Sequence, residues 1–261
     1  MARSLGRLAI VGLGPGASEL WTEETRAELG QAEVVVGYQA YLDLIPASHA
    51  PGERIGYDLG DERLRARRAV AEAAEGRRVA LVSSGDAGVY GMASLALDEV
   101  AALPAPDQPQ VRVLPGISAA LAAAALIGAP LAVDFACLSL SDLLLPWAEL
   151  ESKLVALAAA DITLVIYNPA STRRRAPWEN AVRIIGEARD PATPVAVVSR
   201  AYRPGQVVHL ADVARLDRLW VDMETLVIVG SSRTRRVGDW LVALRDEAGR
   251  ERSLRPGSGS A

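Results

Sequence analysis

The sequence of 261 residues contains a single cysteine, Cys137. One thiol cannot form an intramolecular disulfide, a four-thiolate zinc site or the ligand set of an iron–sulfur cluster. The two histidines, His49 and His209, have no His, Cys or carboxylate residues near them at the spacing of metal ligands. We therefore expect no metal site, and we expect the protein in a reducing cytoplasm.

An excess of basic charge and a long apolar segment are also missing. The 28 Lys and Arg residues are outnumbered by 32 Asp and Glu residues, so no global positive field attracts nucleic acid. The longest apolar stretch, 117–132, contains Gly128 and Pro130 and is shorter than the roughly 20 residues that cross a bilayer. The apolar run near the N-terminus is interrupted by glycines and has no cleavage pattern. We expect no nucleic-acid partner, no signal peptide and no membrane segment.

Aromatic residues make up only 5% of the chain, whereas 50% of the residues are hydrophobic. Val, Leu, Ile and Ala must therefore build the core of a globular protein. In the first half, strand-like runs at 8–13, 34–36, 79–82 and 111–114 alternate with helical stretches at 22–32, 61–76 and 92–103. This alternation predicts an α/β lobe over 1–116.

The pattern restarts after Pro115 and Gly116. The expected helices begin at about 117 and cover 147–159, 178–188 and 237–247, and the expected strands cover 135–140, 162–167, 195–198, 206–209 and 225–229. A turn at Pro204 and Gly205 predicts a mixed rather than a fully parallel sheet. We expect a second α/β lobe over 117–247 and a disordered tail over 248–261, because the tail, with its Pro-Gly-Ser-Gly-Ser run, lacks the means to pack.

A glycine-rich loop, Gly12 to Ala17, follows the first expected strand and precedes a helix. It fits the pattern G-x-G-x-x-(G/A) of dinucleotide-binding folds. Such folds need an acidic residue at the end of the second strand, but the only nearby acid, Glu33, precedes that strand. Pro15 also stands where helical amides should hold a pyrophosphate. The alternative is a loop whose glycines let another ligand approach the backbone.

Two further loops have a similar character. Gly85 to Gly91 surrounds the carboxylate of Asp86 with small residues, which suits a compact polar ligand; the alternative is a tight turn with Asp86 as a helix N-cap. Pro115 to Ala119 suits a ligand loop or a turn capped by Ser118. Each loop alone is ambiguous, and their order along the chain is more specific.

The three loops in this order resemble the tetrapyrrole methylase family. The family's opening V-G-x-G-P-G-x-x-x-x-L-T is matched by 11–22, with Trp21 in place of leucine, its G-D-x-x-x-Y-G by 85–91, and its P-G-x-S-(A/S) by 115–119. Four later segments of this chain also resemble elements of the family: Tyr167-Asn168-Pro169, Thr193-Pro194-Val195, the turn at 201–206 and Thr225-Leu226. The resemblance spans about residues 8–232.

The resemblance implies two α/β lobes of the class III S-adenosylmethionine (SAM) methyltransferase type, a SAM site in the cleft between them, and a homodimer. The residues that the motifs assign to SAM are Pro15, Gly85, Asp86, Ser118, Ala119, Tyr167, Asn168, Ala201, Thr225 and Leu226. Several stretches are narrower and resemble the branch that methylates C17 of precorrin-3B while the macrocycle contracts to precorrin-4. Among them are 83–92, 128–131 followed by Asp134-Phe135, 139–144, and Tyr167-Asn168-Pro169 with the arginines 173–175.

One departure from that branch concerns acid–base chemistry. A histidine usually precedes its Asp-Phe pair, and this chain has Val133 there. The candidates for proton transfer are Asp134, Ser139, Asp142 and Arg173. The alternatives are a methylase of the same family acting on another precorrin or on uroporphyrinogen, and a non-catalytic protein that binds a tetrapyrrole or SAM. The sequence leaves open whether the substrate carries cobalt.

Overall fold

The computed structural model describes residues 5–141, 145–171 and 174–245. The chain divides into two compact units. The first unit contains Met1–Ala122 and Ala201–Pro204, and the second contains Ala123–Arg200 and Gly205–Ala261. The expected tail, 248–261, lies outside the described residues.

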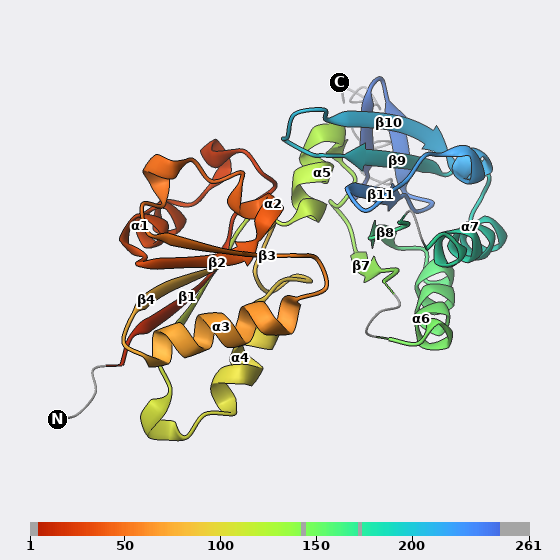
Figure 1. Ribbon diagram of the computed structural model, residues 1–261. Coiled ribbons are helices and arrows are strands. Elements are labelled where there is room, and N and C mark those ends of the chain that lie inside the picture. Colours follow the sequence, from red (N-terminus) through yellow and green to blue (C-terminus); the bar gives the residue numbers. More distant parts are fainter. Residues whose placement is uncertain (1–4, 142–144, 172–173, 246–261) are drawn as a thin grey trace, which may run out of the picture. The chain divides into compact units, whose positions relative to one another are not determined.

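The first unit is built on a parallel sheet in the order β3-β2-β4-β1-β5 (Figure 1). Its strands are β1 (Arg7–Gly12), β2 (Val34–Tyr38), β3 (Glu53–Tyr57), β4 (Arg78–Ser83) and β5 (Gln110–Leu114). Its helices are α1 (Glu23–Gln31), α2 (Gln39–Leu42), α3 (Glu62–Ala74) and α4 (Ala93–Ala101), with short 3-10 turns at Ser18–Leu20, Ala47–His49 and Ala105–Asp107. The predicted alternation of strands and helices is confirmed.

Alternate residues of these strands pack on opposite faces of the sheet. On one face, Leu8 and Ile10 of β1 belong to the core cluster that contains α3 and α4. On the other face, Ala9 and Val11 belong to the cluster that contains residues of α1 and α2. Because both faces are covered, the three inner strands β2, β4 and β1 are apolar over most of their length rather than alternating with polar residues.

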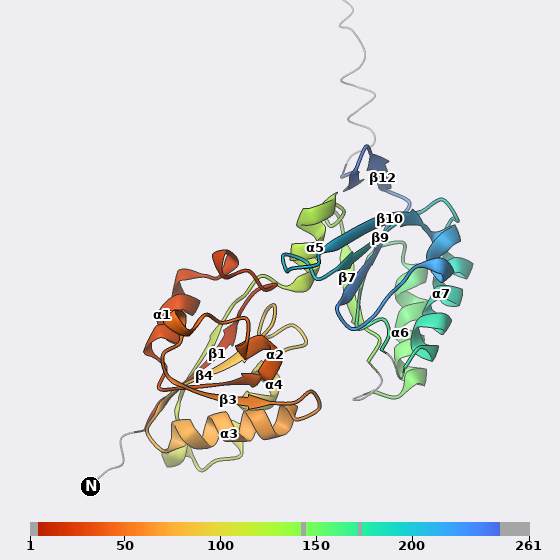
Figure 2. The ribbon, with the colours of Figure 1, turned by 45° about the horizontal axis from the view of Figure 1, so that its top comes forward.

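The second unit contains a mixed sheet in the order β10-β9-β11-β8-β7. Its strands are β7 (Phe135–Ser139), β8 (Thr163–Tyr167), β9 (Pro194–Ser199), β10 (Val207–Asp212) and β11 (Thr225–Val229). Only β7 and β8 are parallel neighbours, which confirms the mixed sheet predicted from the Pro204-Gly205 turn. Helices α6 (Trp147–Ala159) and α7 (Ala176–Ala188) lie side by side on one face, together with the 3-10 turn Val213–Arg218 (Figure 2).

The predicted helix at 237–247 is wrong over its described part. This segment contributes to a small sheet of β12 (Thr234–Val237), β13 (Trp240–Ala243) and β6 (Gly128–Ala129), the last of which follows α5 (Ala119–Ile127). Gly238 takes a positive φ of 60° between the paired residues Val237 and Trp240. A two-residue Gly-Asp loop between apolar residues is a hairpin signal, and it overrides the helical composition.

β3 was not expected from the sequence. It pairs in parallel with β2 at the edge of the first sheet. Its residues, Glu53–Tyr57, are exposed or half-buried throughout, so the segment lacks both the apolar run of a buried strand and a clear alternation. No helix in the described part of the chain has the length and the hydropathy that a membrane span requires.

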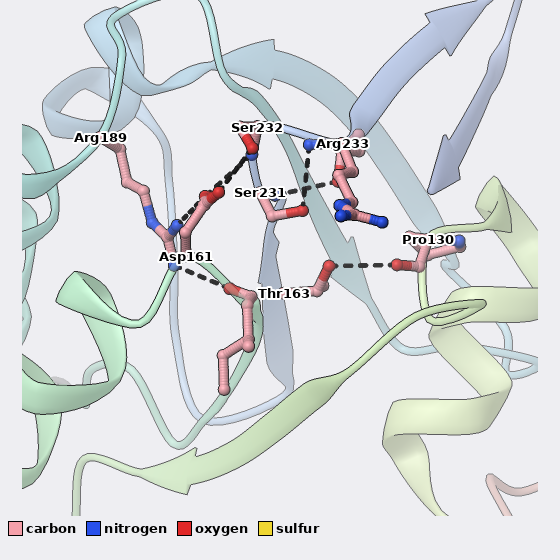
Figure 3. Close-up of polar contacts among 9 residues, drawn as sticks. Pro130, Asp161, Thr163, Arg189, Ser231, Ser232 and Arg233 are labelled. Carbon is pink, nitrogen blue, oxygen red and sulfur yellow. Dashed lines mark hydrogen bonds and ion pairs between the residues drawn. The ribbon is translucent and has the colours of Figure 1, made fainter. Parts of the chain in front are cut away.

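One buried charge network ties the ends of two central strands in the second unit (Figure 3). The Arg189 side chain, only 3% exposed, pairs with the Asp161 carboxylate and donates a hydrogen bond of 2.7 Å to the carbonyl of Ile162, just before β8. Asp161 in turn accepts hydrogen bonds from the amide and the hydroxyl of Ser232, which follows β11. The network therefore joins the start of β8 to the end of β11.

Candidate functional site

Three glycine-bearing loops leave neighbouring parallel strands of the first unit. β1 lies between β4 and β5, and the register pairs Gly12 with Ser83 and Val11 with Leu114. Because these strands end at the same edge of the sheet, the loops 13–17, 84–91 and 115–118 begin side by side. We call them the glycine loops. Open α/β sheets place ligands at this edge.

The backbones of the glycine loops are in direct contact. Gly14 and Gly85 exchange two hydrogen bonds, with N···O distances of 3.0 and 2.7 Å. A Cβ on Gly12 would lie 2.7 Å from the amide nitrogen of Gly116, and a Cβ on Gly116 would lie 2.2 Å from the carbonyl oxygen of Gly85. Gly12 and Gly116 are therefore needed so that the loops can pack against one another.

Asp86 links two of the glycine loops through its carboxylate. Its Oδ2 accepts from the Gly116 N–H at 3.0 Å, and its Oδ1 accepts from the Gly88 N–H at 2.8 Å. The alternative role of Asp86 as a helix N-cap is wrong, since α4 begins only at Ala93 and Met92 donates to the Ser83 hydroxyl. The carboxylate organises the loops rather than a helix end.

Ser118 and Ala119 stand at the start of α5, in front of Gly85. A Cβ on Gly85 would lie 3.6 Å from the Cα of Ser118 and from the amide nitrogen of Ala119. The Ser118 hydroxyl accepts a long hydrogen bond of 3.5 Å from the Leu121 N–H, as an N-cap does. The first unit therefore brings together Gly85, Asp86, Ser118 and Ala119, all of which the motifs assign to SAM.

Pro15 and Ala201 are joined to this region by a residue that the sequence did not single out. Ala201 belongs to the segment of the first unit that also contains Arg203. The guanidinium of Arg203 donates to the carbonyl of Pro15 and, at 2.7 Å, to the hydroxyl of Ser84. Arg203 and Ser84 lie in stretches that the sequence assigns to motifs, 201–206 and 83–92, but those motifs assign no role to their side chains. The structure identifies the contact between Arg203 and Ser84.

The remaining SAM-assigned residues lie at one edge of the second unit's sheet. β11 runs antiparallel to β8, with Val227 paired to Ile166, so Thr225 and Leu226 at the start of β11 lie beside Tyr167 and Asn168 at the end of β8. Asn168 has a positive φ of 50°, and its Nδ2 donates to the Ser139 hydroxyl at 3.0 Å.

Of the candidates for proton transfer, the two that the structure describes, Asp134 and Ser139, are not brought together. Ser139 ends β7, whereas Asp134 precedes the same strand, so five residues of nearly extended chain, roughly 16 Å, separate the two positions. Val133 lies beside Asp134 and is therefore also distant from Ser139. Asp142 and Arg173 lie outside the described residues.

The neighbours of Arg173 have structural contacts within the second unit. Arg174 donates to the carbonyls of Leu140 and, at 3.0 Å, of Asn168, so it supports the left-handed backbone at Asn168. The guanidinium of Arg175 stacks on the exposed ring of Trp220, 5.6 Å from the ring centroid.

The described residues contain no group of three or more His, Cys, Asp or Glu side chains that could hold a metal. His49 packs edge-on against the ring of Trp21. Cys137 is half-buried in β7, and burial raises the pKa of its thiol, which disfavours the thiolate that binds metals.

One cavity of the first unit borders the glycine loops. It is lined by Leu13, Trp21, Tyr41, Ser84 and Arg203, among others, and has room for about one water molecule. It is too small for a nucleoside. Beside the cavity, Gly85 carries no side chain between its backbone and the backbone of Ser118 and Ala119. These features fit the polar groups of SAM.

Comparisons with known proteins agree with this geometry. Residues 7–217 match the family model of tetrapyrrole (corrin/porphyrin) methylases. The chain is 40% identical over 227 residues to a probable cobalt-factor III C(17)-methyltransferase of Salmonella typhimurium, covering 87% of this chain and 93% of that one. It is 36% identical over 236 residues to a precorrin-3B C(17)-methyltransferase of Sinorhizobium, covering 89% and 91%.

A longer relative and two solved structures complete these findings. The chain is 44% identical to the cobalamin biosynthesis protein CobIJ of Mycobacterium bovis over 88% of its own length, but it spans only 45% of that protein. The crystal structure of the methyltransferase CobJ superposes with a TM-score of 0.85 and 38% identity, covering 92% of this chain and all of that one. A uroporphyrin-III C-methyltransferase of Thermus thermophilus, solved with S-adenosylhomocysteine (SAH), gives a TM-score of 0.64 at 25% identity, covering 86% and 97%.

Proposed function

Because this chain belongs to the tetrapyrrole (corrin/porphyrin) methylase family, we propose that it transfers a methyl group from SAM to C17 of precorrin-3B or its cobalt-bearing equivalent, with contraction of the macrocycle to precorrin-4. The observation that carries the proposal is the convergence of the three glycine loops, with Asp86 joining the second loop to the third. Two relatives that match this chain over about nine-tenths of both lengths and are named for C17 methylation support the choice of target carbon.

In the first unit, we propose that SAM is held by Pro15, Gly85, Asp86, Ser118, Ala119 and Ala201. The amides at the start of α5 favour an anionic or accepting group of the ligand, because the N-terminus of a helix carries partial positive charge. In the second unit, the corresponding residues are Tyr167, Asn168, Thr225 and Leu226. When bound, SAM supplies a methyl group that is electrophilic because it is attached to a sulfonium sulfur.

The protein's own task is mainly to position the reactants. Holding the reacting carbon in line with the methyl group removes a translational and rotational cost worth up to about 7–11 kcal/mol in well-oriented systems. The hydroxyl of Ser139 could also make a hydrogen bond to the tetrapyrrole macrocycle of the substrate. Its hydroxyl accepts hydrogen bonds from Asn168 Nδ2 at 3.0 Å and from the Ser141 N–H at 3.3 Å, so the hydroxyl proton is left as its donor. We propose that Ser139 Oγ donates this proton in a hydrogen bond to the substrate.

Product analysis tests the proposed reaction. The purified protein is incubated with SAM that carries a ¹³C-labelled methyl group and with either metal-free or cobalt-bearing precorrin-3-type substrate. We expect a product heavier by one methyl group, with the label at C17 by NMR. Label at another carbon indicates a sibling methylase, and tight binding of both compounds without turnover indicates a non-catalytic binding protein.

The Asp86→Ala variant tests the cofactor assignment. The substitution removes the acceptor of the Gly116 and Gly88 amides, so the second and third glycine loops lose their link. Hydrogen bonds to charged groups are worth about 1.5–3 kcal/mol, so SAH affinity should fall about tenfold to a hundredfold by calorimetry, with an unchanged circular dichroism spectrum. The control is Asp98→Ala, which removes an exposed carboxylate that pairs with Arg63, away from the glycine loops. Equal SAH affinity of Asp86→Ala and wild type rejects the assignment.

We further propose that the protein is a homodimer in the cytoplasm. The family resemblance supports the dimer, and the single cysteine, Cys137, fits a reducing compartment. Sedimentation velocity of the purified chain tests the dimer, and a monomer at micromolar concentration contradicts it.

A further inference from the structure

Arg203 contacts two of the three glycine loops from a distant part of the sequence. Its Nε donates to the carbonyl of Pro15 in the first loop, and its Nη2 donates to the hydroxyl of Ser84 in the second. The segment Ala201–Pro204 belongs to the first unit, although the residues on both sides of it belong to the second. Arg203 therefore links the segment that contains Ala201 to both loops.

Gly16 provides the space for this side chain. A Cβ built on Gly16 would lie 2.6 Å from Cγ and 2.8 Å from Nε of Arg203. The aliphatic part of Arg203 therefore covers the backbone of Gly16. The contact depends on two residues far apart in the sequence, an arginine in one segment and a glycine in the other.

The surroundings of Arg203 leave it little freedom. Tyr41, a half-buried residue, lines the same small cavity as Ser84 and Arg203. Burial raises the pKa of Tyr41, and the positive charge of Arg203 acts against that rise. The cavity between these side chains has room for about one water molecule, so the guanidinium sits in a nearly filled space.

We propose that Arg203 is a positioning residue for SAM: it fixes the carbonyl of Pro15 and holds Ala201 next to the glycine loops. The inference rests on the proposed function, because Pro15 and Ala201 are assigned to SAM there. The planar guanidinium suits this role since it donates in two fixed directions at once. An ammonium group on a flexible stem cannot reproduce both bonds with the same geometry.

Calorimetry with SAH on the full chain tests the inference. Arg203→Met keeps an aliphatic stem over Gly16 but removes both hydrogen bonds, and we expect its affinity for SAH to fall about tenfold or more. Arg203→Lys should be intermediate. The matched control is Arg63→Met, because Arg63 is exposed and pairs with Asp98 and Glu99 rather than with a glycine loop. Its affinity for SAH should equal that of wild type. In the methylation assay, Arg203→Met should raise the KM for SAM more than it lowers kcat.

Two further measurements keep the inference falsifiable. Gly16→Ala places a Cβ against Cγ and Nε of Arg203, on a backbone whose positive φ of 149° also disfavours alanine, and it should weaken SAH binding at least as much as Arg203→Met does. In the ligand-free protein, Arg203→Met should speed hydrogen exchange at the amides of Gly14 and Gly85. These amides donate the two hydrogen bonds that join the first and second glycine loops. If both variants bind SAH as wild type does and exchange is unchanged, the inference is overturned and the proposed function stands. If wild type binds no SAH, the SAM assignment fails, and the exchange rates still decide whether Arg203 fixes the loops.

Discussion

Replacing Gly116 by alanine is expected to abolish measurable SAH binding and to lower the free energy of unfolding by about 1–3 kcal/mol, the usual cost of overpacking a tight interior. A Cβ at position 116 would lie 2.2 Å from the carbonyl oxygen of Gly85 and 2.8 Å from the carbonyl carbon of Gly12. Both are backbone atoms, one in the second glycine loop and one at the end of β1. A change of rotamer cannot relieve the overlap, so the loops have to move apart.

Moving the loops apart breaks the contacts that hold the candidate site together. The bond from the Gly116 N–H to Asp86, 3.0 Å long, is the first to lengthen, and the two bonds between Gly14 and Gly85 follow. The backbone of Ser118, two residues further along, then no longer faces Gly85. The effect on binding should therefore exceed the effect on stability.

Gly30→Ala is the matched control for Gly116→Ala. Gly30 lies in α1, and a Cβ there would meet no atom within 4 Å. Because alanine is a better helix former than glycine, we expect stability to rise by up to about 1 kcal/mol and SAH affinity to stay unchanged. Urea unfolding and calorimetry on both variants provide the comparison. A Gly116→Ala protein with wild-type stability and wild-type affinity would show that the loops are not in tight contact.

The sequence was sufficient to predict the position of the glycine loops. Each one follows a short apolar run, and the parallel order of β4, β1 and β5 brings Ser83, Gly12 and Leu114 to one edge. The sequence did not show why glycine is needed at each of these positions. The sequence predicts that the glycines of the loop 12–17 give a ligand access to the backbone. In the structure, the missing Cβ atoms of Gly12 and Gly116 make room for neighbouring backbone.

Contacts between distant segments were beyond prediction because no local pattern encodes them. Arg203 and Ser84 are 119 positions apart and meet only through the tertiary fold. Asp134 and Ser139 are close in sequence and were grouped as candidates, yet an extended strand places them at opposite ends. Two residues a few positions apart in an extended strand lie far from each other, because each residue adds more than about 3 Å. Residues three or four positions apart in a helix lie on the same face and close together.

The second large effect is expected at the buried network of the second unit (Figure 3). In Asp161→Asn, the Arg189 guanidinium, whose side chain is only 3% exposed, loses its counter-charge while remaining buried. Removing one partner of a buried ion pair costs about 3–5 kcal/mol, and since Asp161 is itself half exposed we expect about 2–3 kcal/mol. Asparagine is chosen because Asp161 has a positive φ of 52°, which asparagine tolerates better than alanine.

The pH dependence of stability follows from the same carboxylate. Partial burial raises the pKa of Asp161, but the Ser232 hydroxyl and amide together with the Arg189 guanidinium lower it more, so its net pKa lies below the ordinary value. A folded pKa below the unfolded one gives stability that is present above the unfolded pKa, near 4, and is lost as the pH falls through the folded pKa. The stability difference between wild type and Asp161→Asn should therefore be constant near neutral pH and shrink below about pH 4.

A double variant separates the charge effect from simple loss of contacts. Arg189→Met combined with Asp161→Asn replaces the buried guanidinium with an apolar chain of similar length, so no unpaired charge remains inside. Replacing a buried ion pair by apolar groups is often close to neutral, and the double variant should accordingly be more stable than Asp161→Asn alone. Urea unfolding at neutral pH and at about pH 3 measures both effects. If the two substitutions are additive and the difference persists in acid, the Asp161 carboxylate does not stabilise the fold through its charge, because an ionic contact must disappear when either partner is neutral.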